Sequence, residues 1–253
     1  MFLPDNTIDS FNQALIEKAD MIEMDVRKTA DGKIVLFHDW YVKPRRINPL
    51  DFSVTRPVSH ISFKELSDFC EVEGFGLISL EEVLQQFGDR IEMNIELKAG
   101  GYEHEVLNLV KKYNLTGDVV FSSFFPWVIK KLKDIDNNVK TGWIVGQEQV
   151  IYLNRLARFW IEPVFKITGA DSVHLQYEII TSGVLQRFQS HNIPVYVWTV
   201  NDTDTMRHLI ELSVDGIITN VPGQLYSLLN GKPVSEKMLL LPGSELAATR
   251  DQL

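Results

Sequence analysis

The sequence predicts one α/β domain of the TIM (β/α)₈ barrel type, with the first strand missing and a small insertion after the second strand. Three observations lead to this prediction. The chain has 253 residues, and about 250 residues is the usual size of one such barrel. From residue 92 onward, short β-rich runs alternate with helical patterns, as parallel strands joined by helices do. The chain opens with a helical pattern, although each barrel helix should follow its own strand.

The N-terminal part departs from the regular rhythm. The elements expected before residue 40 are a helix over 7–18, capped by Asn6 or Thr7, and strands at 21–26 and 34–37 joined by a turn at Ala30-Asp31-Gly32. Residues from about 40 to 76 contain three prolines, a basic cluster over 43–46 and one short helical pattern at 62–69. This stretch is predicted to be the insertion.

The remaining elements follow in barrel order. Strands are expected at 93–97, 119–122, 140–145, 172–175, 195–198 and 216–218, and helices at 102–113, 127–135, 149–165, 182–190, 203–212 and 224–229. Residues 1–230 are therefore predicted to form a single barrel domain. Residues 231–253 contain Gly, Pro and charged residues around a brief apolar run and are predicted to be a C-terminal tail.

Composition excludes several classes of protein. With 45% hydrophobic and 23% charged residues, the chain has the composition of a soluble globular protein. A net charge of -9 argues against a nucleic-acid partner, which would require a basic face. Cys70 is the only cysteine, so neither an intrachain disulfide nor a thiolate metal cluster can form. The sequence shows no transmembrane segment and no signal-peptide pattern, which predicts a cytoplasmic protein.

Acidic residues gather on two of the predicted strands. Glu23 and Asp25 are two residues apart, so both side chains point to the same face, which is the interior in a barrel. Glu96 and Lys98 repeat this spacing on another strand, while Ile95 and Leu97 should pack outward. Buried carboxylates together need a cation, and oxygen ligands suit Mg²⁺, Mn²⁺ or Ca²⁺. The alternative is that these residues are solvated strand ends, but three acids with Lys98 on two interior strands favour a site.

Two histidines are candidates for proton transfer. His38 directly follows the apolar run over 34–37, and its place after the acidic pair favours a catalytic role over a structural one. His174 lies on a short predicted strand and can face the barrel interior. His104 and His208 fall within predicted helices and are expected at the surface.

Several short motifs occur in an order that resembles one known family. They are Pro4-Asp5-Asn6-Thr7, Glu23-Met24-Asp25, Thr29-Ala30-Asp31-Gly32, His38-Asp39, Ile78-Ser79-Leu80-Glu81-Glu82-Val83, Glu96-Leu97-Lys98 and Trp198-Thr199-Val200-Asn201. Each is weak alone, but their order and spacing resemble the glycerophosphodiester phosphodiesterases. The similarity runs from residue 4 to about residue 229.

The resemblance implies metal-dependent hydrolysis of a small-molecule glycerophosphodiester to glycerol 3-phosphate and an alcohol. It implies that Glu23, Asp25 and Glu96 bind the divalent cation. Lys98 would contact the substrate phosphate, Trp198 would bind substrate, and His38 would be one of two acid/base histidines.

The sequence departs from the family pattern in two places. Asp5 stands where the family has glutamate, which is one methylene longer. Family members also begin with a strand that ends in His-Arg-Gly, whereas only Met1, Phe2 and Leu3 precede the first motif here. The resemblance therefore implies that the first histidine, its arginine and the strand that carries them are missing from this sequence.

Two further hypotheses remain open. The chain can be a truncated or catalytically impaired barrel that retains metal or ligand binding without efficient turnover. It can also be a different metal-dependent barrel, such as an isomerase that uses Lys98 as a base, although the insertion and the Trp198 motif argue against this. If another residue replaces the missing histidine, His174 is the first candidate.

Overall fold

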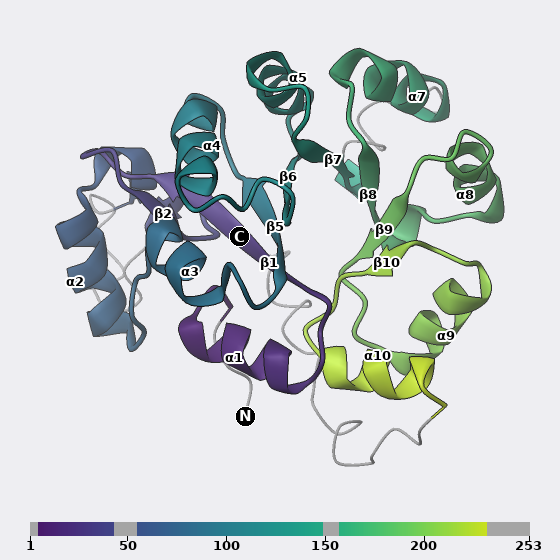
Figure 1. Ribbon diagram of the computed structural model, residues 1–253, viewed down its shortest axis with the longest axis horizontal. Coiled ribbons are helices and arrows are strands. Elements are labelled where there is room, and N and C mark those ends of the chain that lie inside the picture. The colour runs from purple at the N-terminus through teal and green to yellow at the C-terminus, as the bar shows by residue number, and fades with distance from the viewer. Residues whose placement is uncertain (1–4, 43–54, 149–156, 232–253) are drawn as a thin grey trace.

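The computed structural model describes residues 5–42, 55–148 and 157–231, which fold into a curled sheet with an outer layer of helices (Figure 1). The helices are α1 (Ile8–Ile16), α2 (Phe63–Glu73), α3 (Leu80–Phe87), α4 (Glu103–Lys112), α5 (Pro126–Ile135), α7 (Ala157–Thr168), α8 (Ser182–Gln189), α9 (Thr203–Glu211) and α10 (Pro222–Leu229). The strands are β1 (Met21–Lys28), β2 (Ile34–Leu36), β3 (Tyr41–Val42), β4 (Arg56–Pro57), β5 (Glu92–Leu97), β6 (Val119–Ser123), β7 (Lys140–Val145), β8 (Ser172–Gln176), β9 (Val195–Trp198) and β10 (Gly216–Ile217).

The main sheet has the strand order β10-β9-β8-β7-β6-β5-β1-β2. All neighbouring strands in it run parallel except β2, which forms an antiparallel hairpin with the end of β1. Parallel strands joined by outer helices are the architecture of a TIM-type barrel, so the predicted fold class is confirmed. The predicted strands over 140–145 and 195–198 have the observed bounds of β7 and β9.

The curled sheet is open between β10 and β1. Among the described strands, β10 is at one end of the sheet, and β1 is next to the short β2 at the other end, so β10 and β1 do not pair with each other. Helix α1 lies at this opening, and the backbone N–H of Gly223, in α10, donates to Glu17 Oε2 just after α1 at 2.9 Å. The two ends of the sheet are thus connected through helices (Figure 1).

The hydrophobic core lies between the sheet and the helices. Alternate residues of each strand point outward, and Ile95 and Leu97 of β5 are fully buried there, as predicted. One core cluster covers β1, β5 and β6, and a second covers β8 and β9. The residues between these outward positions, including Glu96, point into the curl of the sheet.

Replacing a central core residue should lower stability strongly. Phe121, on β6, is fully buried in the first cluster, so Phe121→Ala is expected to lower the free energy of unfolding by about 3–5 kcal/mol. Chemical denaturation measures this change, and the control is Ile16→Ala, since Ile16 is 71% exposed. A loss below about 1 kcal/mol for Phe121→Ala would contradict the close packing described here.

The predicted insertion is described only in part, since residues 43–54 lie outside the described ranges. Strands β3 and β4 pair antiparallel, and α2 covers the helical pattern expected at 62–69. This part shares a small core with β2, built from Val35, Val42, Val58, Ile61, Leu66 and Cys70. Helix α3 was not predicted, although Ser79 and Glu82 form the capping box that marks its start. The predicted tail beyond residue 231 lies outside the described residues.

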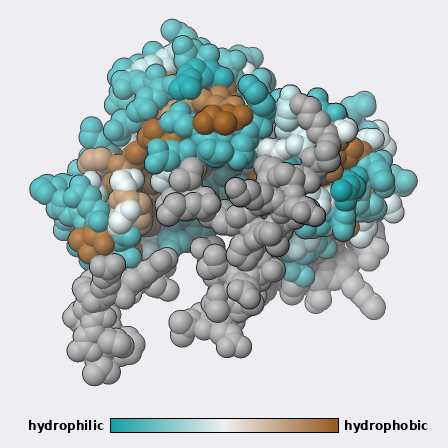
Figure 2. Space-filling model, turned by 90° about the horizontal axis from the view of Figure 1, so that it is seen from below, coloured by the Kyte–Doolittle hydropathy of each residue, from teal (hydrophilic) through white to brown (hydrophobic). Residues whose placement is uncertain are grey.

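One face of the molecule is mainly polar where its residues are described (Figure 2). Figure 2 shows a mainly hydrophilic face on which the hydrophobic areas are small and interrupted. Within the described ranges, none of the helices combines the length and the apolar character that a membrane span requires.

Candidate functional site

Three carboxylates meet where β1 and β5 lie side by side. Asp25 pairs in register with Glu96, and Glu23 precedes Asp25 by two residues on the same face. One carboxylate oxygen from each of Glu23, Asp25 and Glu96 lies within 4.8 Å of the others. Asp25 and Glu96 are buried and Glu23 is half-buried. The sequence-predicted acids are therefore brought together on the inner face of the sheet.

Lys98 places its ammonium group between two of these acids. Lys98 Nζ lies 2.9 Å from Asp25 Oδ1 and 2.8 Å from Glu96 Oε1. Its side chain is only 12% exposed. Lys98 follows the last residue of β5, so the cluster lies at the carboxyl ends of the strands, where barrel enzymes have their active sites.

The three acids differ in how readily they ionise. Burial, together with the charges of Asp25 and Glu96, raises the pKa of Glu23 well above its ordinary value. Burial also raises the pKa of Glu96 to about 7, even though Lys98 opposes this shift. Asp25 is buried too, but the ion pair with Lys98 and a hydrogen bond from Asn6 lower its pKa. The cluster thus holds more negative charge than Lys98 alone can balance.

His38 lies at the edge of this cluster. The backbone N–H of Phe37 donates to Asp25 O at 3.0 Å, which places the next residue beside β1. The His38 side chain is 60% exposed, and its Nδ1 lies 2.9 Å from Asp39 Oδ1. Arg27 donates two hydrogen bonds to the His38 carbonyl, at 3.1 and 2.7 Å, and stacks on Trp40. The backbone at His38 is therefore held while its ring remains accessible.

Phe124 lies near Lys98, and Trp198 packs against Phe124. The Phe124 ring centroid lies 5.8 Å from Lys98 Nζ, and the Trp198 ring packs edge-on against Phe124 at 5.5 Å. Trp198 Nε1 donates to the His174 carbonyl at 3.0 Å. Trp198, proposed from the sequence as a substrate-binding residue, is thus connected to the acidic cluster through Phe124.

His174 does face the interior, but it is buried deeply. Its side chain is 3% exposed, and its Nε2 lies 3.2 Å from Ser172 Oγ. The ring occupies space above Gly142, where an added Cβ would come within 2.3 Å of Nε2. Within the described residues, nothing hydrogen bonds to its Nδ1. Burial lowers the pKa of His174 to about 4, so the ring is neutral at physiological pH.

The buried His174 predicts a specific dependence of stability on pH. Its pKa is lower in the folded state (about 4) than the ordinary value of 6.5, so the folded state binds fewer protons between these values. Above pH 6.5 the ring is neutral in both states and does not affect stability. As the pH falls from 6.5 to 4, the unfolded state binds the proton first, which lowers the free energy of unfolding by about 3 kcal/mol. Denaturation of His174→Gln at several pH values should show a smaller loss. Exposed His208, changed to Gln, is the control, and parallel curves for wild type and His174→Gln would contradict the prediction.

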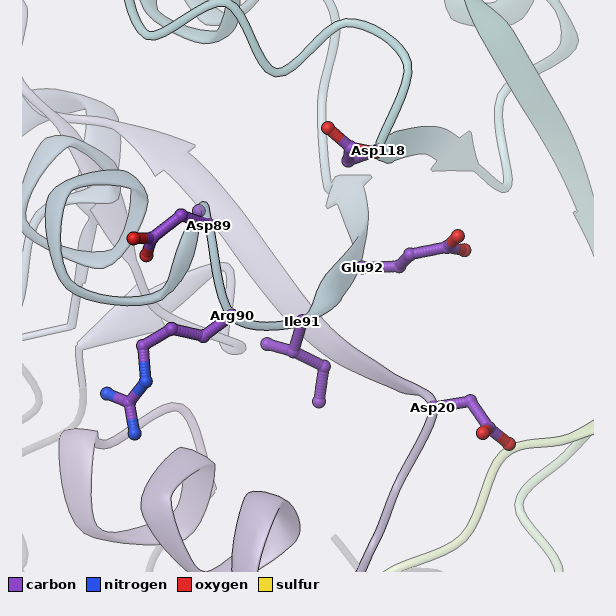
Figure 3. A pocket seen from close by; sticks show the side chains of 7 residues that line it. Asp20, Asp89, Arg90, Ile91, Glu92 and Asp118 are labelled. Atoms are coloured by element: carbon purple, nitrogen blue, oxygen red, sulfur yellow. The ribbon is translucent and has the colours of Figure 1, made fainter.

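A second acidic group lies at the opposite, amino ends of the strands. A pocket there is lined by Asp20, Gly88, Asp89, Arg90, Ile91, Glu92 and Asp118. Figure 3 shows that the carboxylates of its labelled residues point in different directions and do not converge. The converging acids of β1 and β5 are therefore the candidate site.

The structure adds residues that the sequence did not single out for the site. Arg27 continues the two-residue spacing of Glu23 and Asp25, which is a signal that sequence reasoning can use. Phe124 follows β6 directly, at the carboxyl edge of the sheet. The sequence indicates Asn6 as a helix cap and as part of the Pro4-Asp5-Asn6-Thr7 motif, and the structure adds that its side chain hydrogen bonds to Asp25. This contact depends on how α1 packs against β1, and no sequence pattern indicates it.

The chain is similar to known proteins over most of its length. The sequence profile of the glycerophosphoryl diester phosphodiesterase family matches residues 1–224. A glycerophosphodiester phosphodiesterase of Caldanaerobacter subterraneus subsp. tengcongensis is 29% identical over 240 residues, covering 90% of this chain and 93% of that protein. The crystal structure of a glycerophosphodiester phosphodiesterase from Thermotoga maritima is similar with a TM-score of 0.71 and 26% identity, covering 89% of this chain and 92% of that one. An Oleispira antarctica phosphodiesterase, solved with the product sn-glycerol-3-phosphate, shares the fold with a TM-score of 0.70 and 20% identity, covering 90% and 92%.

Proposed function

Because the chain belongs to the glycerophosphoryl diester phosphodiesterase family, we propose that it hydrolyses glycerophosphodiesters to glycerol 3-phosphate and an alcohol. Water adds to phosphorus, the bond from phosphorus to the alcohol oxygen breaks, and the alcohol leaves with a proton. The observation that carries this proposal is the meeting of Glu23, Asp25, Glu96 and Lys98 where β1 pairs with the carboxyl end of β5.

The donor set fits a divalent cation. Three carboxylates and one ammonium leave two negative charges when all are ionised, which a divalent cation balances. Burial and the repulsion between the neighbouring acids raise the pKa values of Glu23 and Glu96, although Lys98 opposes both shifts. Carboxylate oxygens suit Mg²⁺, Ca²⁺ and Mn²⁺. Glu23, Asp25 and Glu96 would hold the ion, which would polarise the phosphoryl oxygens.

The protein side chains have separate roles in this proposal. Lys98 would bind a phosphate oxygen and stabilise the negative charge that grows on it during the reaction. His38 would transfer a proton, and Asp39 at Nδ1 would leave Nε2 as the reacting nitrogen. Trp198 and Phe124 would contact the substrate near Lys98.

Product release tests the proposed function. The protein is mixed with glycerophosphocholine and Mg²⁺, Ca²⁺ or Mn²⁺, and glycerol 3-phosphate is measured with and without a chelator. Release that stops with the chelator supports the proposal. Release of the phosphorylated alcohol in place of glycerol 3-phosphate would place bond cleavage on the other side of phosphorus, and equal release with the chelator would exclude the metal.

A second candidate function is a barrel that binds a metal or ligand without efficient turnover. Of the two candidate histidines, only His38 is accessible, whereas His174 is 3% exposed, and a single accessible histidine favours this candidate. Metal binding by calorimetry together with the absence of glycerol 3-phosphate release would support it.

A further inference from the structure

Asn6 makes two hydrogen bonds to the same residue of the acidic cluster. Asn6 Nδ2 donates to Asp25 Oδ2 at 2.9 Å, and Asn6 Oδ1 accepts from the Asp25 backbone N–H at 2.9 Å. We propose that Asn6 is a positioning residue, which fixes the orientation of Asp25 for cation binding. This inference rests on the proposed function, because it assigns Asp25 to the cation.

The two ends of the Asp25 carboxylate are held from different directions. Lys98 Nζ lies 2.9 Å from Oδ1, whereas Asn6 holds Oδ2. A carboxylate with one fixed oxygen can still rotate about its Cβ–Cγ bond, and a donor at each oxygen removes this freedom. In this orientation one Asp25 oxygen lies within 4.8 Å of an oxygen of Glu23 and an oxygen of Glu96. Partners of this kind orient metal ligands in many sites.

The Asn6 side chain also completes an open edge of the sheet. Lys98 N donates to Val26 O on the β5 side, and Phe37 N donates to Asp25 O on the opposite side. Because backbone groups of successive strand residues point to opposite sides, the Asp25 N–H also points away from β5. Asn6 Oδ1 accepts from that N–H where a neighbouring strand would otherwise supply a carbonyl.

The local fold explains how Asn6 reaches this position. Asn6 has a left-handed backbone conformation (φ 59°), which asparagine tolerates better than most residues. The next residue, Thr7, caps α1 through a reciprocal box with Ser10. Helix α1 is fixed by Phe11, whose ring packs edge-on against Phe87 at 5.7 Å. The packing of α1 therefore determines where the Asn6 amide lies.

A glycine substitution tests the side chain without straining the backbone. Asn6→Gly keeps the left-handed conformation and removes both hydrogen bonds. Exposed Asn114 has the same φ of 59° and lies after α4, so Asn114→Gly is a matched control. Thermal unfolding in chelator shows whether both variants are folded before any ion is added.

Two measurements then decide the inference. Calorimetric titration with Mg²⁺ and Mn²⁺ should show about 10–100-fold weaker binding in Asn6→Gly, with no change in Asn114→Gly. Hydrogen exchange of the Asp25 amide should become faster in Asn6→Gly only. Wild-type affinity in a folded Asn6→Gly would overturn the role of Asn6. If the wild type binds neither ion, the proposed metal site is wrong. Independently of ion binding, unchanged exchange of the Asp25 amide in Asn6→Gly would show that Asn6 does not hold Asp25.

Discussion

The variant Glu96→Gln is expected to lose about 10²–10⁴-fold in the rate of glycerophosphodiester hydrolysis. A bound cation supplies several kcal/mol of charge stabilisation in the transition state, and each tenfold in rate corresponds to about 1.4 kcal/mol. Glutamine keeps the shape of the side chain but removes the charge that a cation requires. Calorimetry with Mg²⁺ should therefore show weaker binding in parallel with the loss of rate.

Stability separates this effect from a loss of structure. The pKa of Glu96 is raised to about 7, so its ionised form destabilises the fold near neutral pH. Glu96→Gln removes this cost, and its unfolding temperature in chelator should be equal to or above that of the wild type. Glu92→Gln is the matched control, since Glu92 is an exposed residue on the same strand. Unchanged metal affinity in Glu96→Gln would show that the cation does not depend on this carboxylate.

Adding a strand that ends in His-Arg-Gly before Pro4 is expected to raise turnover by about 10²–10⁴-fold, the usual contribution of a positioned acid or base. The described sheet is open between β10 and β1, where such a strand would pair. Its histidine would supply the second proton-transfer group that the resemblance implies, and its arginine a further phosphate contact. A steady-state assay with glycerophosphocholine compares the two chains.

Two variants identify the source of the gain. The extended chain with alanine in place of the added histidine should lose most of it, and His38→Ala should lower the activity of both chains. Equal turnover with and without the extension would mean that the added histidine is not needed. His174 would then be tested as its replacement, although its burial and low pKa oppose that role.

The sequence alone predicted the elements that local patterns encode. Alternating runs identified β5, β6, β7, β8 and β9, since outward residues such as Ile95 must be apolar to pack against helices. Two-residue spacing placed Glu23 with Asp25, and Glu96 with Lys98, on shared faces. Helix α3 was not predicted because its eight residues give only a short hydrophobic pattern.

Only the tertiary structure decided which of these residues meet. The pairing of Asp25 with Glu96 depends on the register between β1 and β5, which the packing of the whole sheet determines and no local pattern records. The burial of His174 above Gly142 likewise depends on two neighbouring strands. The contact from Asn6 to Asp25 joins residues 19 positions apart and exists because α1 packs beside the open edge of β1. Spacing along a strand thus predicts which side chains share a face, whereas distances between strands follow from packing.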